Sequence, residues 1–369
     1  MRFIGGIDDA LPFLVAALVG AGVVAFLLTP IVRRVALRLD VVDRPDPRRV
    51  NRSPVPRGGG IAVVVAFVPV ALVLVALNDR LDVLPVPASV DGPRLIALLA
   101  GGVAAAMLGA IDDYLQLRAR WQLVGQVVLA AWAVGIGLGV GTIANPFGGV
   151  IVLAGPIAVA FTVLWIVGMI NSINFIDGLD GLSSGIALIA ALTLGVISLT
   201  TTVGQPLIAV LCFALAGALA GFLRWNFHPA TIFVGTSGVM FIGYTLAVLS
   251  ILGTAKVAVA VLALGVPIID TFWIIVRRLL SGRSPFAPDR GHFHHRLLDL
   301  GLSHTQAVLA IYGLCVALAV LSLFLSGTGQ FYAFLGVFVA SGLVLFVLAR
   351  RTLVAEELEA TSYEEDQAR

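Results

Sequence analysis

Charged residues and cysteines are both scarce in this chain of 369 residues. Asp, Glu, Lys and Arg make up 12% of it, against 59% apolar residues and a mean hydropathy of +1.05. Soluble domains carry about 25% charged residues, so this composition excludes a soluble protein and predicts a membrane protein. The two cysteines, Cys212 and Cys315, both fall in apolar segments, where we expect small apolar packing and no disulfide.

Long apolar runs, by contrast, are abundant. Eleven of them approach the length that an α-helix needs to cross a membrane, about 20 residues. We therefore predict an all-α polytopic integral membrane protein of about eleven transmembrane helices, with the termini on opposite sides. The runs are 11–32, 58–77, 93–111, 121–140, 156–171, 183–200, 205–223, 238–254, 257–277, 306–325 and 330–349.

The chain reads as one transmembrane domain, residues 1–350, followed by an acidic cytoplasmic tail, residues 351–369. Between the fourth and fifth runs, the segment 141–155 is uncharged, rich in Gly and β-branched residues, and interrupted by Asn145 and Pro146. This pattern predicts a small external β-hairpin.

The basic residues are distributed unevenly between alternate loops. One set of loops, together with the C-terminal tail, holds 19 of the 23 Lys and Arg residues. The other side holds four, Arg2, Arg80, Arg94 and Lys256. Cytoplasmic loops carry the basic excess, so we expect the N-terminus outside, the C-terminus inside and the polar motifs at the cytoplasmic face of a bacterial plasma membrane. The net charge of +2 gives no reason to expect a nucleic acid partner.

Two amides and two carboxylates stand in the segment 171–182, between apolar runs. Asn171 and Asn174 are one helical turn apart, and Asp177 and Asp180 repeat this spacing. Asn and Asp also cap helices and form turns without any chemistry, but capping needs one such residue and not four. Carboxylate and amide oxygens suit Mg²⁺ and its phosphate ligands, so we predict a cation or phosphate site here.

Three further carboxylates are candidates for the same site. Asp112 and Asp113 close the third run, where they oppose the helix dipole and are poorly explained as caps. Juxtamembrane charges that merely face water are the alternative. Asp270 lies within the ninth run beside Pro267, and an ionisable residue inside a membrane segment is a functional candidate by default.

The loop 279–305 carries a histidine motif. The candidate binding residues in this motif are Arg290, His292, His294, His295 and Arg296. Zinc is one candidate ligand, but no Cys lies nearby and the spacing is not that of a usual structural zinc site. A solvated basic loop is another alternative. Arg and His recognise phosphate and nucleotide groups, which we expect here.

Several separated motifs are similar to those of the polyprenyl-phosphate N-acetylhexosamine-1-phosphate transferases, over roughly residues 40 to 300. They occur in the family order. The motifs are Pro54-Val-Pro-Arg-Gly-Gly59, Asp112-Asp113 with Leu123 and Gln126, 171–182, Pro229-Ala-Thr-Ile-Phe-Val-Gly235, Pro267-Ile-Ile-Asp270 and Asp289-Arg-Gly-His-Phe-His-His-Arg-Leu297.

This resemblance implies transfer of a sugar 1-phosphate from a UDP-sugar to undecaprenyl or decaprenyl phosphate. The last motif is most similar to that of the branch that uses UDP-N-acetylglucosamine. The resemblance implies Mg²⁺ as the cofactor, with Mn²⁺ as an alternative, and membrane lipid as a partner. A homodimer is compatible with the sequence. Asn174 would help to bind the metal, and Asp112 or Asp113 would position or deprotonate the lipid phosphate. Asp177, Asp180 and Asp270 would line the site. The substrate-binding candidates are Asn171, Arg57, Arg120, Arg290, His292, His294, His295 and Arg296.

The chain departs from the family pattern at three positions. Thr236 stands where the family uses an Asp as a principal Mg²⁺ ligand, Gln122 where a Lys is common, and Asn51 where a His is common. Arg120 is a candidate to replace the lost positive charge. A hydroxyl binds Mg²⁺ much more weakly than a carboxylate, so the metal would be weaker, rebuilt from other carboxylates such as Asp177, or absent.

Two other function classes stay open at this point. One is a family member that has lost catalysis and still binds polyprenyl phosphate or a nucleotide sugar, which the change at Thr236 favours. The other is an ion-coupled transporter, for which we would expect paired repeats and carboxylates near the middle of the membrane. The sequence favours the transferase, because its carboxylates cluster at one face.

Overall fold

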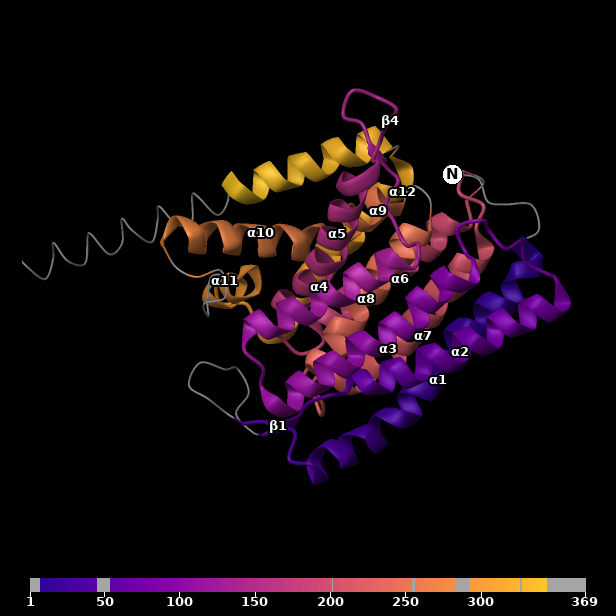
Figure 1. Ribbon diagram of the computed structural model, residues 1–369. Coiled ribbons are helices and arrows are strands. Elements are labelled where there is room, and N and C mark those ends of the chain that lie inside the picture. Colours follow the sequence, from indigo (N-terminus) through magenta and orange to yellow (C-terminus); the bar gives the residue numbers. More distant parts are fainter. Residues whose placement is uncertain are drawn as a thin grey trace, which may run out of the picture.

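The computed structural model describes residues 7–44, 54–200, 202–253, 256–282, 284, 292–325 and 327–343. The protein is a bundle of helices with two short two-stranded sheets (Figure 1). The helices are α1 (Ile7–Arg38), α2 (Gly60–Leu81), α3 (Gly92–Leu115), α4 (Ala119–Gly135), α5 (Gly155–Ile176), α6 (Leu182–Ser198), α7 (Pro206–Asn226), α8 (Gly235–Leu252), α9 (Lys256–Ala263), α10 (Gly265–Leu280), α11 (Phe293–Asp299), α12 (His304–Phe324) and a further helix over 327–343.

The prediction of an all-α polytopic membrane protein is confirmed. Within the described ranges, seven helices are long and apolar enough to cross a membrane: α1, α2, α3, α5, α7, α8 and α12. The pair α9 and α10 makes an eighth if it is counted as one bent span. Within the described residues, each of the eleven predicted runs overlaps with helical structure, but α6 has only 17 residues, so the number eleven stays a prediction.

The predicted run 257–277 is not one straight helix. It is divided into α9 and α10, which are bent by 76° relative to each other at the break. Pro267 lies in the first turn of α10 and has no N–H with which to continue the hydrogen bonds of α9. Figure 1 shows α10 extending away from the main bundle beside the C-terminal helix 327–343. The two pack through Trp273, whose ring stacks on Phe338 at 5.2 Å and whose Nε1–H donates to Ser341 Oγ at 3.2 Å.

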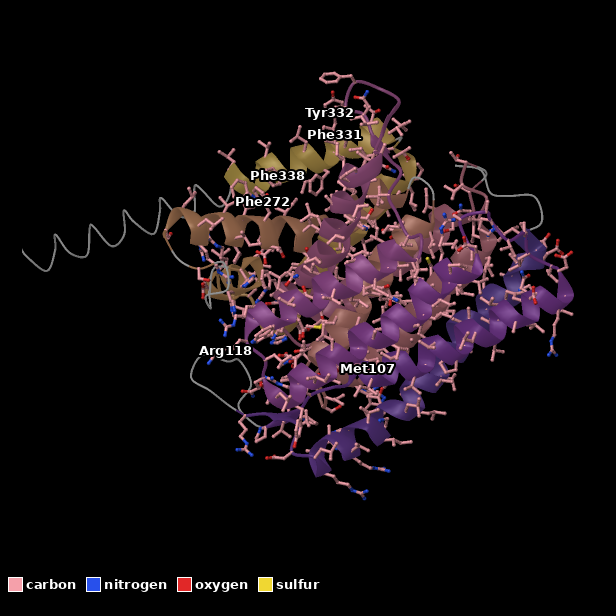
Figure 2. All side chains as sticks on the ribbon, viewed as in Figure 1. Met107, Arg118, Phe272, Phe331, Tyr332 and Phe338 are labelled. Carbon is pink, nitrogen blue, oxygen red and sulfur yellow. The ribbon has the colours of Figure 1, made fainter. Side chains whose placement is uncertain are left out.

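Helices α7 and α8 form the centre of the bundle. Within their apolar windows, 78% and 83% of the residues are buried, against 28% for α1. Glycines allow the helices to approach closely, as between Gly60 of α2 and Gly238 of α8, where an added Cβ on Gly60 would lie 2.0 Å from the Gly238 Cα. The outer helices expose apolar side chains such as Met107 on α3 (Figure 2), as expected of surfaces that face lipid.

Two short hairpins connect the helices. Strands β3 (Thr142–Ala144) and β4 (Val150–Val152) pair antiparallel between α4 and α5, which confirms the predicted hairpin. Strands β1 (Val42–Asp43) and β2 (Val55–Pro56) form a second pair that the sequence did not predict. This second pair brings Asp43 beside Arg57 at the end of the bundle where α3, α5 and α7 end and α8 and α12 begin.

Candidate active site

A cavity of about 620 Å³ lies at this end of the bundle. It receives side chains from the ends of α3, α5 and α7, from the beginnings of α8 and α12, and from the β1–β2 pair. The polar residues that line it are Asp43, Arg57, Asp113, Asn174, Asp177, Asp180, Asn226, His228, Thr236, His295 and His304. Of the predicted site residues, Arg57, Asp113, Asn174, Asp177, Asp180, Thr236 and His295 thus meet in one place.

Asp113 is fixed against the first turn of α8. Its Oδ1 accepts the Thr236 N–H at 2.8 Å and its Oδ2 accepts the Ser237 N–H at 3.0 Å, so it satisfies two donors that a helix N-terminus leaves free. Gly109 of α3 makes this approach possible, because an added Cβ would lie 2.3 Å from the Thr236 carbonyl oxygen. Each carboxylate oxygen keeps a further lone pair for a ligand in the cavity.

Asp112, the neighbour of Asp113, does not line the cavity. Its Oδ1 accepts the Leu117 N–H at 2.9 Å and the Gln122 Nε2–H at 2.7 Å. Asp112 therefore closes the turn between α3 and α4. Gln122, which stands where the family commonly has Lys, is its partner.

The turn between α5 and α6 carries the Asn and Asp motif. Asp177 directly follows α5, and its Oδ1 accepts the Ser183 hydroxyl at 2.5 Å. Burial raises the pKa of the Asp177 carboxyl to about 7; the Ser183 hydrogen bond opposes this increase and the nearby Asp113 carboxylate adds to it. The side chain of Asn174 makes no hydrogen bond to any other described residue. Asn171 lies outside the lining and donates to Gln126 Oε1 at 2.6 Å.

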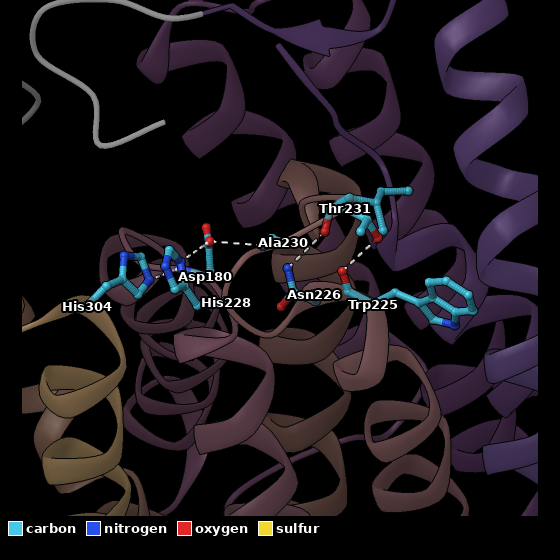
Figure 3. A network of polar contacts seen from close by, with 8 residues as sticks. Asp180, Trp225, Asn226, His228, Ala230, Thr231 and His304 are labelled. Carbon is cyan, nitrogen blue, oxygen red and sulfur yellow. Dashed lines mark hydrogen bonds and ion pairs between the residues drawn. The ribbon is translucent and has the colours of Figure 1, made fainter. Parts of the chain in front are cut away.

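Asp180 is the centre of a second network (Figure 3). Its Oδ2 accepts the His228 Nδ1–H at 2.8 Å and the Ala230 N–H at 3.0 Å. Its backbone N–H donates to His304 Nε2 at 2.9 Å, and the rings of His228 and His304 stack at 4.1 Å. This network ties the turn after α5 to the segment that precedes α8 and to the first residue of α12.

Asp270 holds the histidine motif in place by two hydrogen bonds. Asp270 Oδ2 accepts the His292 Nδ1–H and Oδ1 accepts the Phe293 N–H, each at 2.8 Å. His294 is buried, and its ring packs against Gly178 in the turn after α5. His295 lines the cavity, whereas Asp270, His292 and His294 do not.

The remaining predicted arginines lie elsewhere. Arg120 stands over the ring of its neighbour Trp121, and neither Arg120 nor Arg296 lines the cavity. Arg290, Asn51 and the acidic tail 351–369 are outside the described residues. Arg57 forms an ion pair with Asp43, so the described part of the lining has one arginine and four carboxylates.

The donors in the cavity fit Mg²⁺, although Thr236 contributes only a hydroxyl. Asn174 offers an amide oxygen that no described residue uses, and Asp113 and Asp177 offer carboxylate oxygens in the same cavity. Mg²⁺ takes oxygen ligands of these kinds and keeps several waters. Two neighbouring carboxylates are also a surplus of negative charge that a divalent cation would neutralise.

Sequence reasoning missed Asp43, Asn226, His228 and His304. His228 lies in the cavity and contacts Asp180. Its position directly before Pro229, the first residue of a family motif, was the available signal. Nothing in the sequence singled out Asp43 or His304, because only the β1–β2 pair and the start of α12 bring them here.

The packing of Gly178 against His294 leads to a prediction. A Cβ on Gly178 would lie 2.2 Å from His294 Nε2, so Gly178→Ala should displace the histidine and lower stability by about 1–3 kcal/mol. Gly168→Ala is the matched control, because no atom lies within 4 Å of its added Cβ within α5. Thermal unfolding in detergent checks both variants, and equal unfolding temperatures for the two would contradict the packing described.

Comparisons with known proteins identify the family of this chain. The model of glycosyl transferase family 4 matches residues 95–254. A probable undecaprenyl-phosphate N-acetylglucosaminyl 1-phosphate transferase of Bacillus subtilis is 34% identical over 312 residues, which are 83% of this chain and 83% of that protein. A decaprenyl-phosphate N-acetylglucosaminephosphotransferase of Mycobacterium tuberculosis is 35% identical over 366 residues, 91% of this chain and 89% of that protein.

A more distant relative covers the same region. An undecaprenyl-phosphate alpha-N-acetylglucosaminyl 1-phosphate transferase of Thermotoga maritima is 30% identical over 278 residues, 74% of this chain and 78% of that protein. The matched family region contains Asp113, Asn174, Asp177 and Thr236. The chain belongs to glycosyl transferase family 4, among its polyprenyl-phosphate N-acetylhexosamine-1-phosphate transferases.

Proposed function

We propose that this protein transfers a sugar 1-phosphate from a UDP-sugar to undecaprenyl or decaprenyl phosphate and releases UMP. N-acetylglucosamine 1-phosphate is the first candidate, since the relatives carry this activity in their names. One observation carries the proposal: Asp113, Asn174 and Asp177 come together in a cavity at the end of an apolar helix bundle. A lipid phosphate can reach such a cavity from the membrane and a nucleotide from water.

The reaction forms one bond and breaks one. An oxygen of the lipid phosphate attacks the phosphorus that carries the sugar, and the bond between the two phosphates of the UDP-sugar breaks, with UMP as the leaving group. Asp177, with a pKa of about 7, is the candidate to accept the proton of the lipid phosphate. Asp113 is held by two backbone N–H groups and orients the reacting phosphate together with Asn174.

Charge is the main obstacle in this cavity. Both substrates are anions, and the described lining carries Asp43, Asp113, Asp177 and Asp180 against Arg57. Mg²⁺, or Mn²⁺, held by Asn174 and Asp113, would neutralise the phosphates and polarise the bond that breaks, and Asp177 would stay free of the ion to accept the proton. The same carboxylates lie at one end of the bundle, which favours a transferase over an ion-coupled transporter.

We place the site at the cytoplasmic face of a bacterial plasma membrane, with the N-terminus outside and the C-terminus inside. The excess of Lys and Arg in the loops on the cavity side supports this orientation, and UDP-sugars are cytoplasmic substrates in such a reaction. The product would begin a cell-envelope polysaccharide.

The decisive experiment is release of UMP by the purified protein in detergent, with undecaprenyl phosphate and UDP-N-acetylglucosamine. We expect release that requires both substrates and stops when Mg²⁺ and Mn²⁺ are removed. Binding of either substrate without release would instead identify a family member that has lost catalysis. Absence of both binding and release would overturn the proposal.

A further inference from the structure

His228 lines the cavity but takes no part in the bond changes proposed for the transfer. It lies between α7 and α8, and its ring is held on two sides (Figure 3). The Nδ1–H donates to Asp180 Oδ2 at 2.8 Å, and the ring stacks on that of His304 with centroids 4.1 Å apart and planes 17° from parallel. A ring that is held at one nitrogen and on one face has a defined orientation.

The second ring nitrogen of His228 is available to a ligand. Its Nε2 has no hydrogen-bond partner among the described residues, and the side chain is 40% exposed. The two nitrogens of an imidazole are distinct, and the partner of one sets the role of the other. Since Asp180 takes Nδ1–H, Nε2 stands at the opposite edge of the ring, where a group that enters the cavity can contact it.

The pair of Asp270 and His292 shows what distinguishes His228. It has the same hydrogen bond from Nδ1–H to a carboxylate oxygen, also at 2.8 Å. The side chain of His292 is only 11% exposed, however, and neither Asp270 nor His292 lines the cavity. The carboxylate partner is thus common to both histidines, whereas the exposed ring in the cavity belongs to His228.

The charges around His228 suit an anionic ligand only if the cavity gains cations. The described lining has four carboxylates against one arginine, and this arginine forms an ion pair with Asp43. When a phosphate lies at Nε2, the ring stands between two anions, an arrangement that favours the imidazolium. Both nitrogens of an imidazolium donate, and hydrogen bonds between charged groups are about twice as strong as neutral ones.

We propose that His228, held by Asp180 and His304, donates a hydrogen bond from Nε2 to a phosphate oxygen of a substrate in the cavity. The inference rests on the proposed function, because it takes the ligands of the cavity to be phosphates. The phosphate belongs either to the nucleotide or to the polyprenyl phosphate, and the chemistry of recognition is the same for both. His228 thereby adds a cation to a cavity that is rich in carboxylates.

Two substitutions separate a phosphate contact from a purely structural role. Asparagine places its amide nitrogen near the position of Nδ1, so His228→Asn can keep the hydrogen bond to Asp180 but does not reach the ligand. Glutamine is one methylene longer, so His228→Gln places a neutral donor near the position of Nε2 and gives up the bond to Asp180. A structural role predicts that the asparagine variant stays closer to the native protein, and a phosphate contact predicts the reverse.

Binding of UMP and of a short-chain polyprenyl phosphate is measured separately, on the full-length protein in detergent with excess Mg²⁺. We expect His228→Asn to weaken at least one of them by about 10-fold to 100-fold, the loss of one hydrogen bond to a charged group. His228→Gln should weaken the same ligand by less, and the ligand that is affected identifies the source of the phosphate. Affinities of His228→Asn within about 3-fold of the native values for both ligands, a larger loss in His228→Gln, or no binding of either ligand by the native protein would overturn the proposal.

A measurement on the native protein decides if a variant fails to fold. Diethyl pyrocarbonate acylates accessible imidazoles, and UMP or the polyprenyl phosphate should slow the modification of His228 that mass spectrometry detects. His294, which is 1% exposed, is the internal control for a buried ring. Equal modification of His228 with and without each ligand would refute the contact.

The failure of this inference differs from that of the proposed function. Release of UMP by the native protein, combined with native affinities in His228→Asn, would refute the role of His228 alone. Binding that depends on His228 without any release of UMP would refute the transfer and leave the phosphate contact in place.

Discussion

Replacing Thr236 with aspartate is expected to raise the affinity of the cavity for Mg²⁺ by at least about 10-fold, or ~1.4 kcal/mol. Position 236 lines the cavity at the first turn of α8, beside Asp113 and within the same cavity as Asn174 and Asp177. The variant adds a carboxylate to a set of oxygen donors that has only a hydroxyl there, and carboxylates are the stronger Mg²⁺ ligands.

Thermal unfolding of Thr236→Asp provides a second measurement that needs no turnover, because the new carboxylate is repelled by Asp113. The N–H of residue 236 donates to Asp113 Oδ1 at 2.8 Å, so an aspartate at this position would stand beside an existing carboxylate. Without metal the two charges repel, and the variant should unfold at a lower temperature than the native protein. With Mg²⁺ the repulsion is offset, so the thermal shift on adding Mg²⁺ should be larger in the variant.

The control is Thr236→Asn, which has the shape of aspartate without its charge. We expect a much smaller gain in Mg²⁺ affinity from it. Transfer by Thr236→Asp combined with silence from the native chain would show that the native protein has lost its metal and retains only binding. Equal Mg²⁺ affinities of Thr236→Asp and the native protein would show that this position does not approach the metal.

The sequence predicted the membrane fold well because its signals are local. Apolar run length and the Gly-rich segment 141–155 each follow from neighbouring residues, and both the helices and the β3–β4 hairpin form as expected. The break between α9 and α10 has a local cause as well, in Pro267, but hydropathy averages across it. The run 257–277 therefore looked like one helix.

The site was predicted only in part because its geometry depends on contacts between distant segments. The adjacent residues Asp112 and Asp113 are equivalent in the sequence, but one closes a turn and the other reaches α8, more than 120 residues away. His304 enters the cavity through the packing of α12, and Asp43 through the β1–β2 pair. No local pattern carries this information, whereas the family motifs did point to Asn174 and Asp177.

Asp177→Asn is expected to lower the rate of transfer by about 10²–10⁴-fold, the range of a general base. The amide has nearly the same shape as the carboxylate, and its oxygen can still accept the Ser183 hydroxyl that lies 2.5 Å from Asp177 Oδ1. The variant therefore removes the charge and the proton acceptor while it keeps the local hydrogen bond. Unfolding temperature should be unchanged or higher, because a buried carboxylate near Asp113 is replaced by a neutral group.

The pKa of Asp177 also predicts how the rate of transfer changes with pH. Burial raises the pKa of Asp177 to about 7, so the side chain is protonated below that pH and ionised above it. Transfer by the native protein should rise as the pH increases through about 7, and Asp177→Asn should lose this rise along with the rate. Initial rates of UMP release over this range, at saturating concentrations of both substrates, provide the measurement.

Ser183→Ala tests the role of the Asp177 carboxylate separately from the hydrogen bond that Ser183 donates to it. It removes the hydroxyl that opposes the increase in the pKa of Asp177, so the midpoint of the pH profile should move to higher pH while the rate at high pH falls by less than about 10-fold. A parallel loss of rate in Asp177→Asn and Ser183→Ala at every pH would mean that Asp177 acts through the shape of the turn after α5. In that case Asp113, which accepts the Thr236 and Ser237 N–H groups at the cavity wall, would be the next candidate to accept the proton.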